Sequence, residues 1–267
     1  MKFLIKCVTI ICIAGSSAAM AASTYSAITG NWHLDEGKGQ KTLDVSGNNK
    51  PAQLGSTVAV DDNDPVWMAR NFDNAALHFD GDNDYLRVSY AKNFEPKAVS
   101  VEAWVRSIDS SDVNSLKYIV AKSGLSCAYA AYALYTRGGE LAFYIWNGTS
   151  YIESPVTSAV WDGGWHHIVG TYDNKAVRLF VDGVQVGSGT PENLAISYAS
   201  FTHKDLYIGS YDDGSVCFAD DPELQGTYSN GHFSGDIDSV RIWNRALSPS
   251  EISGSSISYG NAPKTGH

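Results

Sequence analysis

The feature that most constrains the fold of this chain is a two-residue turn between two β-rich runs at 176–188. VRLFV precedes Asp182-Gly183 and VQV follows it. A type I′ turn requires positive φ at both central residues, and Asp-Gly between β-rich runs is a strong short-range hairpin signal. Residues 176–188 are therefore predicted to form a β-hairpin.

The same period of two recurs along the chain. In Val99–Arg106, Val and Ala alternate with Ser, Glu, Trp and Arg, which places one face of a strand in a core. Residues 141–145 alternate likewise before the turn signal Asn147-Gly148. Many short strands with Gly and Asp turns, and no long helical periodicity, indicate an all-β sandwich or barrel. Further strands are predicted at 28–34, 76–79, 85–88, 118–122, 165–172, 206–210 and 237–243.

The first 21 residues have the composition of a secretory signal. Lys2 and Lys6 precede a short apolar run at 7–14, and Ala19 and Ala21 form an A-x-A-like cleavage site. The apolar run is too short to span a bilayer as a resident helix. We expect cleavage after Ala21 and export of a soluble protein to the periplasm or the extracellular space, without membrane insertion.

The rest of the chain is expected to form one domain at 22–253, followed by a flexible tail at 254–267 that is rich in Ser, Gly and Pro. A short helix is expected to begin at Ser248. Pro249 suits the first helical position, and Glu251 stands where a capping box needs it.

Charge narrows the classes of partner. The whole chain has a formal net charge of −10, and the signal contains two Lys and no acid, so the mature charge is −12. An acidic surface of this size argues against nucleic acid and anionic membranes. Neutral glycans, calcium or basic partners fit better.

Only Cys127 and Cys217 lie outside the signal. Two cysteines in an exported chain most often form one disulfide, which we expect here. Two unpaired thiols are the alternative. Their spacing excludes a cysteine-cluster zinc site.

Six stretches, in order and in spacing, resemble the LamG-like jelly-roll domains of the concanavalin A-like lectin/glucanase superfamily. They are WHLDEGKG at 32–39 with DVSGN at 44–48, ALHFDG at 76–81 with DYL at 84–86, VEAWV at 101–105, WHHIVGTYD at 165–173, LFVDG at 179–183 and GDIDSVRIWNRALS at 235–248. The resemblance covers roughly 27–252. It implies two antiparallel sheets, one concave and one convex, in a jelly-roll sandwich.

Some members of this superfamily bind sugars, some bind proteins, and some are glycan hydrolases or lyases, so the fold does not decide the function. The hydrolases of this fold carry glutamates bracketing an aspartate on one strand, and no such arrangement occurs here. The lyase constellation is not visible either. No catalytic residue is assigned, and a non-catalytic role is favoured.

The pair His166-His167 is predicted to be structural. Adjacent residues on a strand point to opposite faces, so the two rings cannot share one ligand. The resemblance gives the same pair a structural place.

Calcium is the cofactor we expect. If the last strand runs unbroken, Asp238 shares an apolar face with Val240 and Ile242, where a carboxylate is costly unless it is paired or binds a cation. The resemblance implies a calcium ligand on this strand and others from the loop of the first strand, with Asp35 and Asp80 as further candidates. The alternative is a salt bridge from Asp238 to Arg87, Arg178 or Arg241.

Aromatic residues point to a glycan partner, because sugar rings pack on aromatic faces. Tyr144 and Trp146 project opposite Phe143 and Ile145, and Tyr151 follows in the next strand. These residues are the candidate ligand-binding set; alternatively, the rings simply cover the second face of the sheet. We expect a secreted, calcium-stabilised, carbohydrate-binding module. The alternatives are a protein-interaction or adhesion domain at a cell surface, or a glycan hydrolase or lyase.

Overall fold

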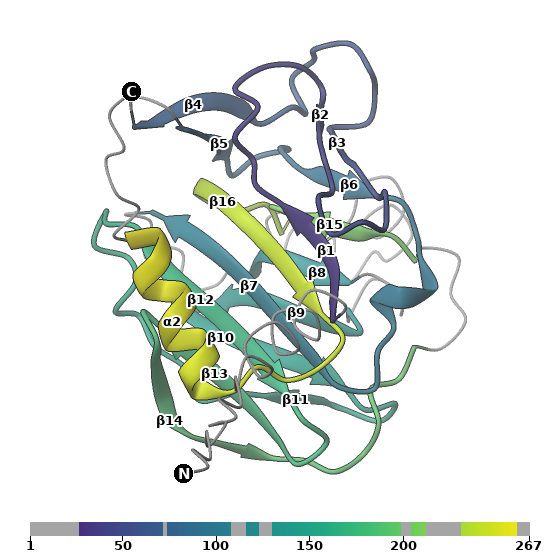
Figure 1. The fold of residues 1–267 in the computed structure, drawn as a ribbon, viewed down its shortest axis with the longest axis vertical. Coiled ribbons are helices and arrows are strands. Elements are labelled where there is room, and N and C mark those ends of the chain that lie inside the picture. The colour runs from purple at the N-terminus through teal and green to yellow at the C-terminus, as the bar shows by residue number, and fades with distance from the viewer. Residues whose placement is uncertain are drawn as a thin grey trace, which may run out of the picture.

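The computed structural model describes residues 27–71, 74–107, 116–122, 130–198, 204–211 and 231–260. They form two antiparallel sheets of eight strands each, which confirms the predicted all-β jelly-roll sandwich (Figure 1). Between the strands there is a short 3-10 helix, η1 (Lys92–Phe94), and one α-helix, α2 (Pro249–Gly260), follows the last strand. In the described part of the chain, no helix is long and apolar enough to cross a membrane.

The first sheet, sheet A, has the strand order β14-β13-β12-β7-β16-β5-β4, and β1 also pairs with β16. β16 lies next to the central strand β7, and on its other side it bonds β5 with its first half and β1 with its second. The strands of sheet A are β1 (Ile28–Trp32), β4 (Val66–Asn71), β5 (Asn74–Asp80), β7 (Val99–Arg106), β12 (His166–Tyr172), β13 (Ala176–Val181), β14 (Val184–Pro191) and β16 (Ser234–Trp243).

The second sheet, sheet B, has the order β11-β10-β9-β8-β15-β6-β3-β2. Its strands are β2 (Lys41–Thr42), β3 (Ala52–Leu54), β6 (Leu86–Val88), β8 (Leu116–Lys122), β9 (Tyr132–Arg137), β10 (Glu140–Trp146), β11 (Tyr151–Glu153) and β15 (Leu206–Ile208).

The predicted hairpin is confirmed. Asp182 and Gly183 connect β13 and β14 with φ of 50° and 82°, the positive values that a type I′ turn needs. The alternation of Val99–Arg106 is confirmed as β7 with the same bounds. β9 was not predicted, because its sequence YALYTR lacks polar alternation. Five of its six residues are buried, and both of its faces carry tyrosine or alanine.

The core lies between the sheets. Phe79 and Val101 of sheet A meet Leu134 and Phe143 of sheet B in one cluster of buried side chains. Gly170 lets the sheets approach closely, since a Cβ there would overlap the ring of Phe143. A side chain at this position of β12 would separate the two layers.

A bulge in β16 overturns the premise of unbroken strand parity. The pairing with β7 shifts between Asp238 and Arg241, and Ser239 has a φ of 50°. The extra residue returns Val240 to the core, while Asp238 lies opposite Trp104. Asp238 therefore points away from the core, and the predicted apolar face does not include it.

Helix α2 lies on the outer face of sheet A (Figure 1), where Leu247 and Ile252 pack against Val169 of β12 and Phe180 of β13. The helix continues through residues 254–260, seven residues past the domain boundary expected at 253. The expected tail begins within this helix, and residues 261–267 lie outside the described residues.

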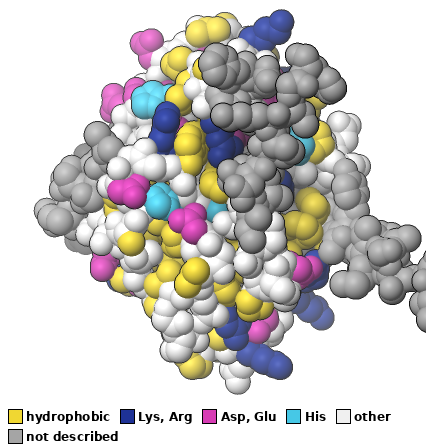
Figure 2. All heavy atoms as spheres, turned by 60° about the vertical axis from the view of Figure 1, so that its left-hand side comes forward, with side chains coloured by type: hydrophobic (Ala, Val, Ile, Leu, Met, Phe, Trp, Pro, Cys, Tyr) yellow, Lys and Arg dark blue, Asp and Glu magenta, His cyan; other side chains and the backbone are white. Residues whose placement is uncertain are grey.

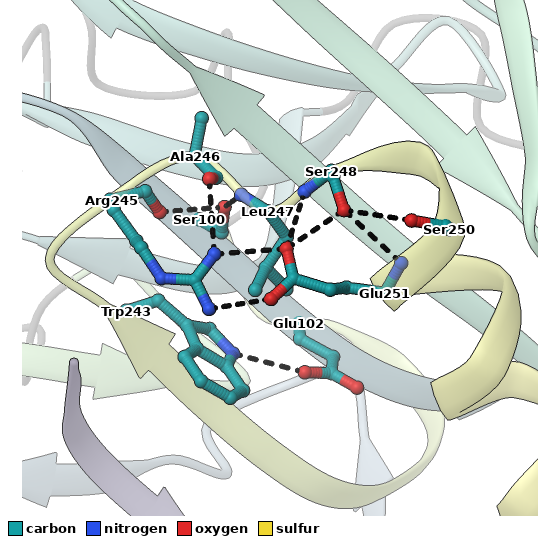
Figure 3. Close-up of polar contacts among 9 residues, drawn as sticks. All are labelled: Ser100, Glu102, Trp243, Arg245, Ala246, Leu247, Ser248, Ser250 and Glu251. Atoms are coloured by element: carbon teal, nitrogen blue, oxygen red, sulfur yellow. Dashed lines mark hydrogen bonds and ion pairs between the residues drawn. The ribbon is translucent and has the colours of Figure 1, made fainter. Parts of the chain in front are cut away.

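The expected capping box is present at the start of α2 (Figure 3). The Ser248 amide and hydroxyl donate to Oε2 of Glu251 at 2.8 and 2.9 Å, and the Glu251 amide donates to Oγ of Ser248 at 3.3 Å. Arg245 adds two bonds to the Glu251 carboxylate, at 2.9 and 2.7 Å. The hydrogen bond from Arg245 is the main cause that lowers the pKa of Glu251 to about 2.

A buried carboxylate joins α2 to the sheet. Glu102 of β7 accepts hydrogen bonds from Arg241 at 2.9 Å and Ser255 of α2 at 2.6 Å, and it bonds Nε2 of His167 at 2.8 Å. It also accepts from the Trp243 indole at 3.1 Å, the contact that Figure 3 shows. Burial opposes its charge, but these partners outweigh burial and lower the pKa of Glu102 to about 2. Side chains from β12, β16 and α2 thus all bond the carboxylate of Glu102 on β7.

Glu102→Gln is expected to lower the free energy of unfolding by about 3–5 kcal/mol, because it removes one partner of a buried ionic cluster. Urea unfolding followed by tryptophan fluorescence measures this. Glu140→Gln, at the exposed start of β10, is the matched control and should change the value by less than about 0.5 kcal/mol. A loss at Glu102 no larger than the control's would contradict this role.

Candidate functional site

The outer face of sheet B carries an unusual group of buried rings, which we call the tyrosine cluster: Tyr118, Tyr135, Tyr144 and Tyr211. The rings of Tyr135 and Tyr144 meet edge to face with centroids 4.9 Å apart, and Tyr118 and Tyr135 stack at 5.7 Å. Small side chains lie between them and leave room for the rings: Ala121, Ala130, Ala133 and Ala142. A second apolar layer thus lies on the side of the sheet away from the core.

At the edge of this cluster four side chains reach the surface from β9, β10 and β11. We call Arg137, Trp146, Tyr151 and Glu153 the Tyr151 patch. Trp146 lies directly opposite Tyr151 in the strand register. Arg137 donates to Oε2 of Glu153 at 2.9 Å and to the Tyr151 hydroxyl at 3.3 Å. Tyr151 is 39% exposed, and the Arg137 side chain is 52% exposed.

The tyrosine cluster holds this patch from below. The Tyr135 hydroxyl donates to Oε1 of Glu153, and the Tyr144 ring meets Tyr151 edge to face at 6.1 Å. Burial, helped by the bond to Glu153, raises the pKa of Tyr135, so its phenol keeps the proton that it donates. Burial likewise raises the pKa of Tyr144. Glu153 is therefore fixed from two sides.

The patch combines two kinds of contact. Tyr151 and Trp146 offer aromatic surface, while Arg137 offers N–H donors and Glu153 offers acceptors. Both oxygens of Glu153 already accept hydrogen bonds, so the carboxylate is positioned as an acceptor for a ligand. This combination suits a ligand with an apolar face and several hydroxyl groups.

The structure brings the three predicted residues together, and Tyr144 and Trp146 point away from the core as expected. Tyr144, however, is only 3% exposed and supports the site from beneath. Sequence reasoning missed Arg137, Glu153 and the support from Tyr135. Glu153 could have been found from the sequence, because a strand period of two places it on the same face as Tyr151. Arg137 could be placed near them only from the pairing of β9 with β10.

The acidic candidates are not brought together. Asp238 is fully buried and forms an ion pair with Arg70. The expected salt bridge is therefore present, but its partner is not one of the three arginines named from the sequence. Those arginines form other ion pairs: Arg87 with Asp205, Arg178 with Asp173, and Arg241 with Glu102. Burial raises the pKa of Asp238 to about 6 despite Arg70.

Of the other two acidic candidates, Asp35 lies in the loop after β1 and Asp80 is the last residue of β5. Asp35 is half-exposed, 3.9 Å from His33, and Asp80 accepts the Asp82 amide at 2.8 Å in a turn. Within the described residues, no group of three or more His, Cys, Asp or Glu side chains could hold a metal. The calcium prediction itself stays untested.

The two adjacent histidines have separate partners, as predicted. His167 bonds Glu102 in the buried cluster. His166 bonds Asp182 at 2.7 Å and Asp162 at 3.0 Å at the surface. Cys127 and Cys217, the expected disulfide, lie outside the described residues.

Other charged groups are paired across the outer face of sheet A. Asp236 bonds His78 at 2.8 Å and Arg106 at 2.6 Å, and the Arg70 guanidinium lies 4.5 Å from the Trp165 ring centroid. Figure 2 shows histidine, acidic and basic side chains interspersed on one side of the molecule. Among the described residues visible there, charges of opposite sign alternate, so this side favours no highly charged partner.

The two open sheets define a jelly-roll β-sandwich of the lectin type. The chain belongs to the concanavalin A-like lectin/glucanases superfamily, because the Laminin_G_3 family model matches residues 79–253, more than half of the chain. The recognition of this family from the sequence is confirmed. Among curated proteins, none matches this chain.

Solved structures share the fold at low sequence identity. The binding domain of Paraclostridial Mosquitocidal Protein 1 is 16% identical with a TM-score of 0.62, over 89% of this chain and 53% of that one. The botulinum neurotoxin serotype D binding domain is 14% identical with a TM-score of 0.61, over 90% and 53%. This chain therefore spans about half the length of these structures, and the likeness shows the fold alone.

The stabilities of two variants distinguish a tyrosine that is packed in the buried layer from a tyrosine that lies at the surface of the patch. Tyr144→Ala is expected to cost about 3–5 kcal/mol, because it leaves a cavity in the tyrosine cluster. Tyr151→Ala should cost less than about 1 kcal/mol, because Tyr151 is 39% exposed at the edge of the packed layer and Tyr144 only 3%. Chemical denaturation measures both. Equal losses would show that Tyr151 belongs to the packed layer.

Proposed function

We propose that this protein is an exported, non-catalytic carbohydrate-binding module that takes its ligand on the Tyr151 patch. The observation that carries the proposal is an exposed tyrosine ring beside a tryptophan and an Arg–Glu pair, with Tyr151 and Glu153 in contact with a buried layer of rings. Sugar rings pack their C–H faces on such rings while their hydroxyls bond planar polar groups. The secretory composition of residues 1–21 supports export.

Solved structures that contain this fold occur with a glycan and with a protein partner. The serotype D domain occurs in a complex with N-acetylneuraminic acid, and the DC binding domain in a complex with rat synaptotagmin II. Those complexes do not identify the partner of this chain. The reason for proposing a glycan is the geometry of the Tyr151 patch.

Replacing Tyr151 or Trp146 by Ala should remove a stacking surface and cost about 1–3 kcal/mol of glycan binding each. A glycan array finds the ligand, and calorimetric titration measures the loss. Tyr90→Ala is the matched control, since Tyr90 is 37% exposed and lies beside Lys122 and Lys204 instead.

Three results would contradict the proposal. They are unchanged glycan binding by both patch variants, binding to a protein partner that depends on the same rings in the absence of any glycan ligand, and release of new reducing or unsaturated ends from a bound polysaccharide. The last would make the module an enzyme.

We also propose that calcium stabilises the domain through exposed carboxylates, with Asp35 in the loop after β1 and Asp80 at the end of β5 as the candidates. Calcium at about 100 times its Kd should then add about 2.7 kcal/mol of stability by mass action. The melting temperature is measured in chelator and in calcium. Asp35→Asn and Asp80→Asn should weaken the response, and Asp62→Asn, an exposed control, should keep it. Equal melting temperatures in both buffers would contradict the proposal.

A further inference from the structure

Arg137 is the group in the Tyr151 patch that could attract an acidic sugar, and its surroundings work against this. Its guanidinium is bonded to Glu153 at 2.9 Å. Glu140 holds the position opposite Arg137 in the pairing of β9 with β10, but the described ion pair of Arg137 is with Glu153. The cation thus already has a counter-charge, in a chain whose net charge is −10.

The Glu153 carboxylate cannot easily turn away from Arg137. The Tyr135 hydroxyl donates to its Oε1 from the buried side, while Arg137 donates to its Oε2. Its side chain is 16% exposed, against 52% for Arg137. A sugar carboxylate that bonded the guanidinium would lie close to the fixed negative charge of Glu153, and the two like charges would repel each other.

The same pair suits an uncharged sugar. Among the described contacts, Arg137 uses one N–H toward Glu153 and one toward Tyr151, out of five donors. Neighbouring hydroxyls of a sugar can accept from the remaining donors and donate to Glu153, while the sugar ring packs on Tyr151.

Resting on the proposed function, we infer that the ligand of the Tyr151 patch is a neutral glycan and that Glu153 determines this specificity by holding Arg137. Glu153 excludes uronates and other carboxylated sugars because it occupies and neutralises the one cation of the patch.

The test uses matched polysaccharides that differ in the sugar carboxylate: glucan and glucuronan, galactan and polygalacturonate, mannan and mannuronan. The unaltered protein should bind the neutral member of at least one pair about tenfold more tightly or better. Glu153→Gln should lower this preference at least about tenfold, since it leaves Arg137 without its counter-charge. Glutamine keeps the shape of the side chain and an acceptor for Tyr135, and the melting temperature checks the fold.

Glu140→Gln is the matched control, because it removes the same charge without breaking the bond to Arg137. It should change the preference by less than about threefold. A preference unchanged in Glu153→Gln, or a protein that prefers the carboxylated member, would overturn the inference. If Tyr151→Ala still weakens glycan binding in that case, the proposed function stands. No binding to any glycan would overturn the proposed function itself.

Discussion

The buried carboxylate of Glu102 is the interaction on which one side of the structure depends. It lies at the centre of sheet A, where β7, β12 and β16 run side by side, and Ser255 of α2 donates to it. A buried charge is tolerated only when partners surround it, and here Arg241, His167 and Trp243 complete the set. The helix therefore covers the part of the outer face of sheet A that lies around Glu102.

Sheet B uses its outer face differently. The tyrosine cluster covers it with packed rings. The hydroxyl of Tyr144 accepts the Ala130 amide and that of Tyr135 donates to Glu153, so two of the rings also make hydrogen bonds. Tyr144 and Tyr135 contribute little surface of their own, yet they fix the side chains above them. A preorganised ring and acceptor lose less entropy when a ligand binds.

The sequence predicted most of the fold because alternation and turn chemistry are local properties. The Asp182-Gly183 hairpin and β7 follow from a few neighbouring residues. β9 was missed because YALYTR has tyrosine, alanine or leucine at its first four positions, so polar and apolar residues do not alternate there. Asp238 was misplaced for a related reason: one extra residue at Ser239 reverses the facing of all that precedes it, and nothing local in the sequence marks such a bulge.

The residues of the candidate site likewise fall into those that the local sequence pattern predicts and those that it does not. Tyr144, Trp146 and Tyr151 could be found because period two places them on one face of two consecutive strands. Arg137 depends on the partner strand, and its character depends on Glu153, sixteen residues further along the chain. An arginine read from the sequence alone suggests an anion site, whereas the same arginine bonded to a fixed carboxylate forms an ion pair that has no net charge. The chemistry of the patch therefore comes from the pairing of strands and could not be read from any single stretch of sequence.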